Sequence, residues 1–216
     1  MKTGRLVSIV LLTLAVNAQY ASAEVINPTA SFTLRATNNA GPVLDMDSLW
    51  DGSGFNGFLT NAQDQHQVDR TYFEFDMTAL GVAVSSATLN FSLVGSSCFS
   101  DLVSLSWYSA NGTAEFNDWF TAQTPVTTFN AAAGAYAVDI TALVNSNLGS
   151  LAFIGFGFAI DPHPQQAFFN QSVPAQINFQ PAPEPSTYAM LLAGLTLLGA
   201  ICHTRRRPAS RRAAPA

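Results

Sequence analysis

Apolar and polar residues alternate along much of the middle of the chain. From Ser86 to Leu93, an apolar residue at every second position alternates with Ser, Thr or Asn. Because successive side chains of a strand point to opposite faces, this period of two predicts a half-buried β-strand over residues 84–94. The same alternation predicts further strands at residues 102–108 and 136–140.

Residues 151–160 are apolar on both faces, which is the pattern of a strand in the middle of a sheet. Within this segment, Gly155 and Gly157 alternate with large apolar residues, so one face carries only small residues at these positions. We expect another part of the chain to come close to that face.

Loop signals rich in Gly, Pro and Asn separate the predicted strands. Short strands with regular turns are typical of β-sandwiches and jelly rolls. The 48% apolar content, which includes sixteen Phe, supplies the material for a buried core. We therefore predict an all-β fold, with a single jelly-roll-like β-sandwich domain over residues 24–180.

The N-terminal segment, residues 1–23, has the pattern of a signal peptide. Basic residues precede an apolar run at residues 6–16, which is too short to span a membrane comfortably. The segment ends in Ala21-Ser22-Ala23, a small-x-small pattern after which signal peptidase cleaves. We therefore expect a cleaved signal, with Ala21 and Ala23 as the cleavage-site residues, rather than an N-terminal membrane anchor.

The C-terminal end combines a stiff spacer, an apolar segment and a basic cluster. Residues 181–187 form a Pro-rich linker, which proline holds extended. Residues 188–204 predict a hydrophobic helix. Its apolar run is shorter than the about 20 residues that cross a membrane comfortably. Residues 205–216 form an Arg-rich tail that we expect to stay cytoplasmic. The residues expected to stop translocation are Arg205, Arg206 and Arg207.

The segment PAPEPSTYAMLLAGLTLLGAICHTRRR closely resembles the PEP-CTERM sorting signal of Gram-negative bacteria. In that family, the helix inserts in the inner membrane, and an exosortase cleaves near the Pro-Glu-Pro motif, much as other sorting tails are removed. The resemblance implies transient inner-membrane anchoring and then release to the outer cell surface or the extracellular matrix. It also implies that Pro183, Glu184 and Pro185 form the recognition motif.

Parts of the middle region resemble DNRLRE-type and related carbohydrate-binding-like β-sandwiches. The segment RTYFEFDMTAL at residues 70–80, followed by SATL at 86–89, is similar to their R-x-Y-x-x-F-D strand pair. The segments FNDW at 116–119 and YAVDITALV at 136–144 are similar to further elements of these domains. The resemblance implies a fold and leaves the function open.

Charge is segregated along the chain. Residues 24–181 contain thirteen acidic residues against two basic ones, Arg35 and Arg70, which leaves a net charge of −11. Nucleic acid requires basic patches, so it is excluded as a partner. We expect Arg70 to form a structural ion pair with an acidic residue near it in the chain, such as Glu74 or Asp76.

The exported part offers few groups for catalysis. It has two histidines, His66 and His163, and no lysine, G-x-S-x-G elbow or H-E-x-x-H helix. We therefore predict no catalytic residues and no enzymatic activity. The alternative, an envelope hydrolase, would require two carboxylates that face each other across a groove.

Two sets of residues could bind ligands. Asp45, Asp47 and Asp51 could hold a structural calcium ion; the alternative is an acidic surface loop that binds no metal, and we predict no other cofactor. Aromatic side chains near loops could contact sugars, unless they pack into the core instead. The candidate sugar contacts are Trp50, Tyr72, Tyr108 and Trp119.

These observations predict a non-catalytic cell-surface protein, sorted through its C-terminal tail and associated with the extracellular polysaccharide matrix or with adhesion. A carbohydrate-binding module is the alternative. The expected partners are signal peptidase and exosortase during processing, the inner membrane transiently, and extracellular polysaccharide.

Overall fold

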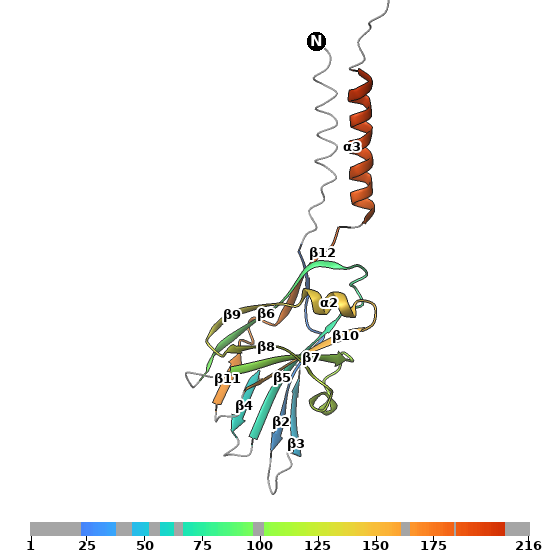
Figure 1. Ribbon diagram of the computed structural model, residues 1–216. Helices are drawn as coiled ribbons and strands as arrows, with labels where there is room; N and C mark the ends of the chain where they lie inside the picture. Colours follow the sequence, from blue (N-terminus) through green and yellow to red (C-terminus); the bar gives the residue numbers. More distant parts are fainter. Residues whose placement is uncertain are drawn as a thin grey trace, which may run out of the picture. The chain divides into compact units, whose positions relative to one another are not determined.

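The computed structural model describes residues 23–37, 45–51, 57–62, 67–96, 102–160, 165–183 and 185–205. The chain divides into two units, Met1–Pro181 and Ala182–Ala216. The first, called the β-unit, contains the strands, and the second contains one long helix (Figure 1). Most of the predicted signal peptide, with Ala21, and the end of the Arg-rich tail lie outside the described residues.

The β-unit is built mainly from strands, and the strands predicted from alternation at residues 84–94, 102–108 and 136–140 and from the apolar run at 151–160 are confirmed. Strand bounds are β1 Glu24–Ile26, β2 Ala30–Thr37, β3 Asp45–Asp51, β4 Phe58–Ala62, β5 Gln67–Asp76, β6 Val84–Ser96, β7 Leu102–Ala110, β8 Thr124–Asn130, β9 Gly134–Asp139, β10 Phe153–Ile160, β11 Gln165–Phe169 and β12 Gln176–Pro181. The described part of the unit also contains two short helical elements: η3, Phe116–Trp119, and α2, Thr141–Asn147.

Backbone hydrogen bonds connect the strands into one antiparallel network. The larger half has the strand order β3-β2-β5-β10-β7-β8, and the smaller half has the order β1-β12-β6-β9. Strands β4 and β11 link the halves, because β4 pairs with β5, β11 pairs with β6, and the two pair with each other. The all-β prediction therefore holds for most of the unit, but a single sandwich of two separate sheets is not confirmed.

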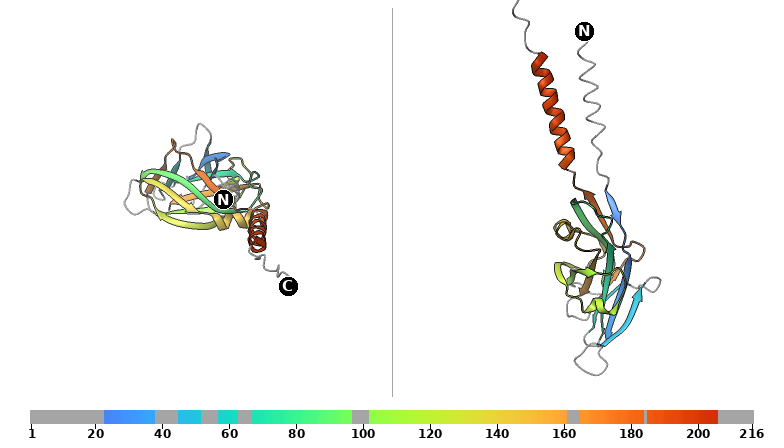
Figure 2. Two further views of the ribbon diagram at one scale, coloured as in Figure 1. Left: turned by 90° about the horizontal axis from the view of Figure 1, so that it is seen from above. Right: turned by 90° about the vertical axis from the view of Figure 1, so that its right-hand side faces the viewer.

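The inner faces of the two halves enclose one apolar core. Phe158 of β10 lies at its centre, with ring centroids 5.9 Å from Phe73 of β5 and 4.9 Å from Phe91 of β6, both edge-on. Because Phe73 and Phe158 belong to the larger half and Phe91 to the smaller, these contacts hold the halves together. Figure 2 shows the strands arranged around this core rather than in one flat layer.

The outer face of the larger half carries a second, smaller apolar cluster, which includes Tyr72 and Tyr108. The glycines of β10 make room for these two rings. A Cβ atom at Gly155 would overlap the ring of Tyr108, and one at Gly157 would lie 3.0 Å from the ring of Tyr72. The expected close approach to this face is therefore made by side chains of the neighbouring strands β5 and β7.

Helix α2 was not predicted, because seven residues are too few to produce a clear helical period. It begins directly after β9, where Asp139 Oδ1 accepts hydrogen bonds from the backbone N–H and the hydroxyl of Thr141 at 2.9 and 2.6 Å. The side chain of Asn145 then bonds both backbone groups of Val84, each at 2.9 Å. These contacts attach α2 to β6.

The second unit contains α3, Pro185–Arg205, which agrees with the predicted C-terminal helix but begins three residues earlier. Proline is well suited to the first turn of a helix, where its missing N–H leaves no hydrogen bond unmade. Large apolar side chains are exposed along α3, among them Met190, Leu192 and Leu197.

Among the residues that the structure describes, no helix combines the length and the apolar character needed to cross a membrane.

Candidate functional site

Three polar side chains, Arg70, Tyr72 and Glu74, occupy alternate positions of β5 and therefore share the outer face of this strand. The connection between β7 and β8, residues 111–123, contains η3 and packs against the same face. It contributes Trp119, part of the outer apolar cluster, and Gln123, which contacts Tyr72. The result is a polar cluster between the sheet and a loop.

Glu74 is the centre of this cluster and is completely buried. Its Oε1 accepts a hydrogen bond from the Tyr108 hydroxyl at 2.8 Å, and its Oε2 accepts one from the backbone N–H of Gly112 at 2.7 Å. Burial raises the pKa of Glu74, and the nearby Asp118 adds to this, against the opposing effect of the two donors. The carboxyl group therefore links β5, β7 and the 111–123 segment.

Asp118 is the second buried acid of the cluster. Its Oδ2 accepts a hydrogen bond from the backbone N–H of Glu115 at 2.9 Å, which completes a capping box at the start of η3. Burial raises the pKa of Asp118, as it also raises the pKa values of Tyr72 and Tyr108. These groups are held in their neutral forms over a wider pH range than free side chains.

Arg70 does not form the predicted ion pair. Its guanidinium lies over the Trp119 ring, 4.1 Å from the ring centroid, and its buried Nε has no hydrogen-bond partner. Among the described residues, the ion pair is formed instead by Arg35, whose Nε is 2.7 Å from Asp69 Oδ1. The reason is geometric: Arg70 projects toward the covering loop, whereas Asp69, on the other face of β5, meets Arg35 across the register of β2 and β5.

The buried cluster has the chemistry of a structural anchor. Both oxygens of Glu74 already accept hydrogen bonds, and its side chain is closed to solvent, so no substrate can approach it. A buried polar group that is fully hydrogen-bonded holds its neighbours in one arrangement. We conclude that Glu74 positions the 111–123 segment on the sheet.

The four candidate sugar contacts are not brought together. Tyr72 and Tyr108 are buried and meet edge-on, with ring centroids 5.9 Å apart. Trp119 is half-buried above the outer face, and Trp50, also half-buried, stacks with Arg35, 4.5 Å from its ring centroid, on the other face of the sheet. Two of these rings are thus core residues, and the two tryptophans are separated by the sheet.

The three aspartates of the predicted calcium site lie on strand β3 rather than in a loop. Asp47 and Asp51 are exposed, and the four-residue spacing along a strand separates their backbones by roughly 13 Å, too far for one calcium ion to join both carboxylates. The side chain of Asp45 lies outside the described residues. Among the described side chains, no three His, Cys, Asp or Glu residues are grouped to hold a metal ion.

The sequence did not identify Glu74 and Asp118 as members of a buried polar cluster. One signal was available for Glu74, which interrupts a strand that is otherwise apolar from Tyr72 to Phe75. Its partners lie 34 and 38 residues further along the chain, so alternation alone could not identify them.

The predicted sorting motif straddles the start of α3. Pro183 is exposed ahead of the helix and Pro185 is its first residue, while Glu184 lies outside the described residues. Of the arginine cluster, Arg205 ends α3, and Arg206 and Arg207 lie outside the described residues.

Residues 181–207 match the family model described as the PEP-CTERM protein-sorting motif. The match confirms the PEP-CTERM resemblance and marks the protein as an exosortase target that is exported and sorted through the membrane to the cell surface. No curated protein matches the chain. The resemblance of the middle region to DNRLRE-type domains has no support from these comparisons.

Proposed function

We propose that this protein is a non-catalytic component of the bacterial cell surface, which joins the extracellular polysaccharide matrix or serves in adhesion. The observation that carries the proposal is the sorting motif, which begins at residue 181. The β-unit ends at that same residue. A motif placed directly after the last strand can reach a membrane enzyme without unfolding the unit that it delivers.

We further propose that cleavage after Ala23 starts the mature chain and that the two halves of the β-unit are a jelly-roll-like sandwich joined at one side by β4 and β11. What supports the sandwich is the single core shared by the inner faces of both halves. What supports the cleavage site is the position of β1, which begins at Glu24. A cut after Ala23 would therefore leave all the described strands complete.

The absence of a catalytic role is part of the proposal. It is supported by the hydrogen bonds of the buried acids: both oxygens of Glu74 accept, from Tyr108 and from the backbone N–H of Gly112, and Asp118 Oδ2 accepts from the backbone N–H of Glu115. Hydrolysis by paired carboxylates requires both groups to face a shared, accessible space. Glu74 is fully buried and does not meet that requirement.

The sorting step can be tested in a host that contains an exosortase. Wild type is compared with a variant in which Pro183, Glu184 and Pro185 are replaced by alanine, and with a control variant, Pro208→Ala, just beyond the matched segment. The measurements are intact mass and distribution between the inner membrane and the exterior. We expect wild type and the control to lose the tail and leave the inner membrane, while the triple variant stays there uncut.

If all three proteins remain in the inner membrane with Arg205–Arg207 intact, the tail is a plain anchor and the proposed destination is wrong. If the triple variant is cut and released as efficiently as wild type, the motif is not the recognition element.

A further inference from the structure

A groove of about 260 Å³ opens into the β-unit between the last strands of its two halves. In the described part of the chain, β8 pairs with β7 and β9 pairs with β6, so the network is left open on this side. The residues that line the groove come from β7, β8, the end of β9 and the start of α2. They are Trp107, Pro125, Val126, Asp139, Ile140, Ala142 and Leu143.

Trp107 is the aromatic residue of the groove, and the main core supports its ring. Its ring is partly buried and packs against the main core, which limits its movement. Within the described part of the chain, its indole N–H has no hydrogen-bond partner, yet the atom is not buried. Trp107 therefore lines the groove with an aromatic side chain that also carries one unpaired donor.

Asp139 provides an acceptor on the other side of the groove. Its Oδ1 is occupied by the two hydrogen bonds from Thr141, which fix the orientation of the carboxylate. Those bonds lower the pKa of Asp139, so the group is ionised at neutral pH. Its Oδ2 has no partner among the described residues, and the side chain is exposed.

The chemistry of the groove matches a sugar. An aromatic wall suits the apolar C–H face of a pyranose ring, and the fixed donor and acceptor suit its hydroxyls. The carboxylate, within a region of net charge −11, disfavours anionic ligands such as uronates or phosphates. The volume is below the about 300–1,000 Å³ of a pocket that encloses a small molecule, which fits a short stretch of a longer chain running past it.

We propose that this groove binds one or two residues of an uncharged polysaccharide strand, with Trp107 as the stacking platform and Asp139 Oδ2 as the acceptor for a sugar hydroxyl. The proposal rests on the proposed function, since it supplies the site through which the β-unit would join a polysaccharide matrix. Neither residue belongs to the sugar contacts expected from the sequence.

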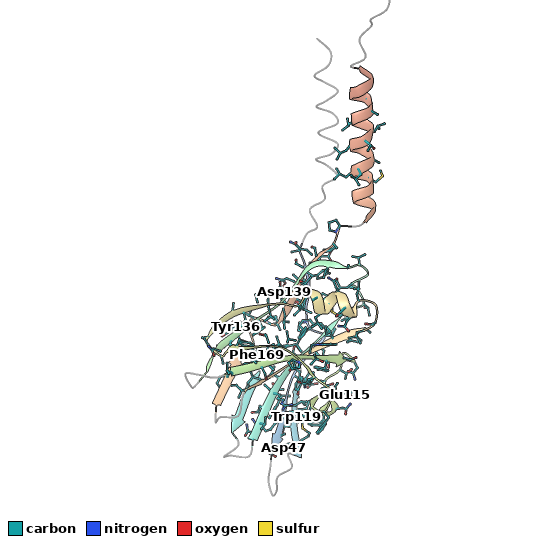
Figure 3. The ribbon with its side chains drawn as sticks, viewed as in Figure 1. Asp47, Glu115, Trp119, Tyr136, Asp139 and Phe169 are labelled. Atoms are coloured by element: carbon teal, nitrogen blue, oxygen red, sulfur yellow. The ribbon has the colours of Figure 1, made fainter. Side chains whose placement is uncertain are left out.

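The protein contains three tryptophans, so two substitutions leave the tryptophan fluorescence to Trp107 alone. The full-length variant W50F/W119F retains Trp107 alone. Figure 3 places Trp119 at the opposite end of the β-unit from Asp139, so that substitution lies away from the groove. The variant is titrated with neutral hexamers of β-1,4-glucan, β-1,3-glucan, β-1,4-mannan and β-1,4-linked N-acetylglucosamine. We expect saturable change in emission with at least one hexamer.

Two substitutions then test the assigned contacts by calorimetry with the hexamer that binds. Asp139→Asn retains the oxygen that accepts from Thr141 but replaces the free acceptor by a donor, and we expect about tenfold weaker binding, which corresponds to about 1.4 kcal/mol. Trp107→Phe keeps a ring against the core but removes the indole N–H, and we expect a similar loss. Trp119→Phe is the matched control and should bind as wild type does.

The proposal is overturned if none of the four hexamers changes the emission of Trp107, or if W107F and D139N bind as tightly as wild type. Tighter binding of hexagalacturonate than of the neutral hexamers would also overturn it. The sorting experiment is independent of this one. If the protein is sorted but binds no hexamer, only the proposed sugar site is wrong. If it binds a hexamer but is not sorted, the proposed delivery to the cell surface is wrong.

Discussion

Glu74 shows how one buried carboxyl group can couple the fold of the β-unit to pH. It is completely buried, and it joins β5 to Tyr108 and to Gly112. Burial raises its pKa in the folded protein, and the unfolded chain has no such effect. A raised folded-state pKa contributes stability below the unfolded value of about 4.3, and this contribution is lost as pH rises through the folded value.

We therefore predict that the β-unit is less stable at pH 8 than at pH 5 and that Glu74→Gln reduces this difference. Glutamine is neutral at both pH values and can still hydrogen-bond to its neighbours. Asp118, whose pKa burial also raises, contributes in the same direction and leaves part of the difference in place. The measurement is the free energy of unfolding in urea at the two pH values.

Asp76→Asn is the control for this prediction. The carboxylate of Asp76 is exposed, and hydrogen bonds from the hydroxyl and backbone N–H of Thr78 lower its pKa. Its contribution is lost only as pH falls below the ordinary range of about 3.9, so the control should keep the wild-type difference between pH 5 and pH 8. An unchanged difference in Glu74→Gln would show that this carboxyl is not the titrating group.

Gly155 allows a second prediction at the residue scale. A side chain there would overlap the ring of Tyr108, so Gly155→Ala should destabilise the protein by about 1–3 kcal/mol. Gly81→Ala is the matched control, because a Cβ atom at Gly81 meets nothing within 4 Å, and its effect should stay within about 1 kcal/mol. Urea unfolding midpoints distinguish the two, and equal effects would contradict the packing described.

At the scale of elements, one side chain attaches α2 to β6. The side chain of Asn145 donates to the Val84 carbonyl and accepts from its N–H. One amide side chain thus performs the role of a strand backbone.

We predict that Asn145→Ala destabilises the β-unit by about 1–3 kcal/mol, because two backbone groups lose their partners. Ser146→Ala is the control, since the Ser146 hydroxyl bonds only within the same helix, to Leu143 and Asn147. Thermal unfolding of both variants measures the effect. A loss in Ser146→Ala as large as that in Asn145→Ala would indicate that helix formation, rather than the contact with β6, is being measured.

The elements differ in how well the sequence predicts them. Strands β6 and β7 follow from local alternation, because most of one face of each is buried, and β10 follows from its apolar run, which is buried on both faces. Strand β3 was not predicted, because its aspartates suggest a surface loop; Asp47 and Asp51 are exposed on this strand, which pairs with β2. Such a strand is stabilised by pairing with β2, which the local pattern does not contain.

At the scale of the whole molecule, the two units are stabilised by different kinds of contact. In the β-unit, tertiary contacts hold the structure, as in the core between the two halves. In the second unit, the hydrogen bonds of α3 form within the helix itself, so its existence is readable from a local apolar run. The same holds for the sorting motif, whose recognition depends on an order of features along a short segment.

The groove belongs to the scale of the whole molecule, because its two polar groups come from different halves. Trp107 lies on β7 of the larger half, and Asp139 ends β9 of the smaller half. From the sequence, Trp107 is a core-facing residue of a strand and Asp139 is one acid among thirteen in residues 24–181. Only the open side of the strand network brings them to one groove.

The sequence by itself determined the β character of the middle region, the positions of its buried strands, the C-terminal helix and the sorting motif. Each of these depends on residues that are neighbours in the chain, so a periodic pattern or an ordered motif reveals it. The tertiary structure alone decided that Tyr72 and Tyr108 are buried, that Glu74 holds the 111–123 segment, and that Arg70 stacks on Trp119. These contacts join residues far apart in the chain, and strand pairing determines which of them meet.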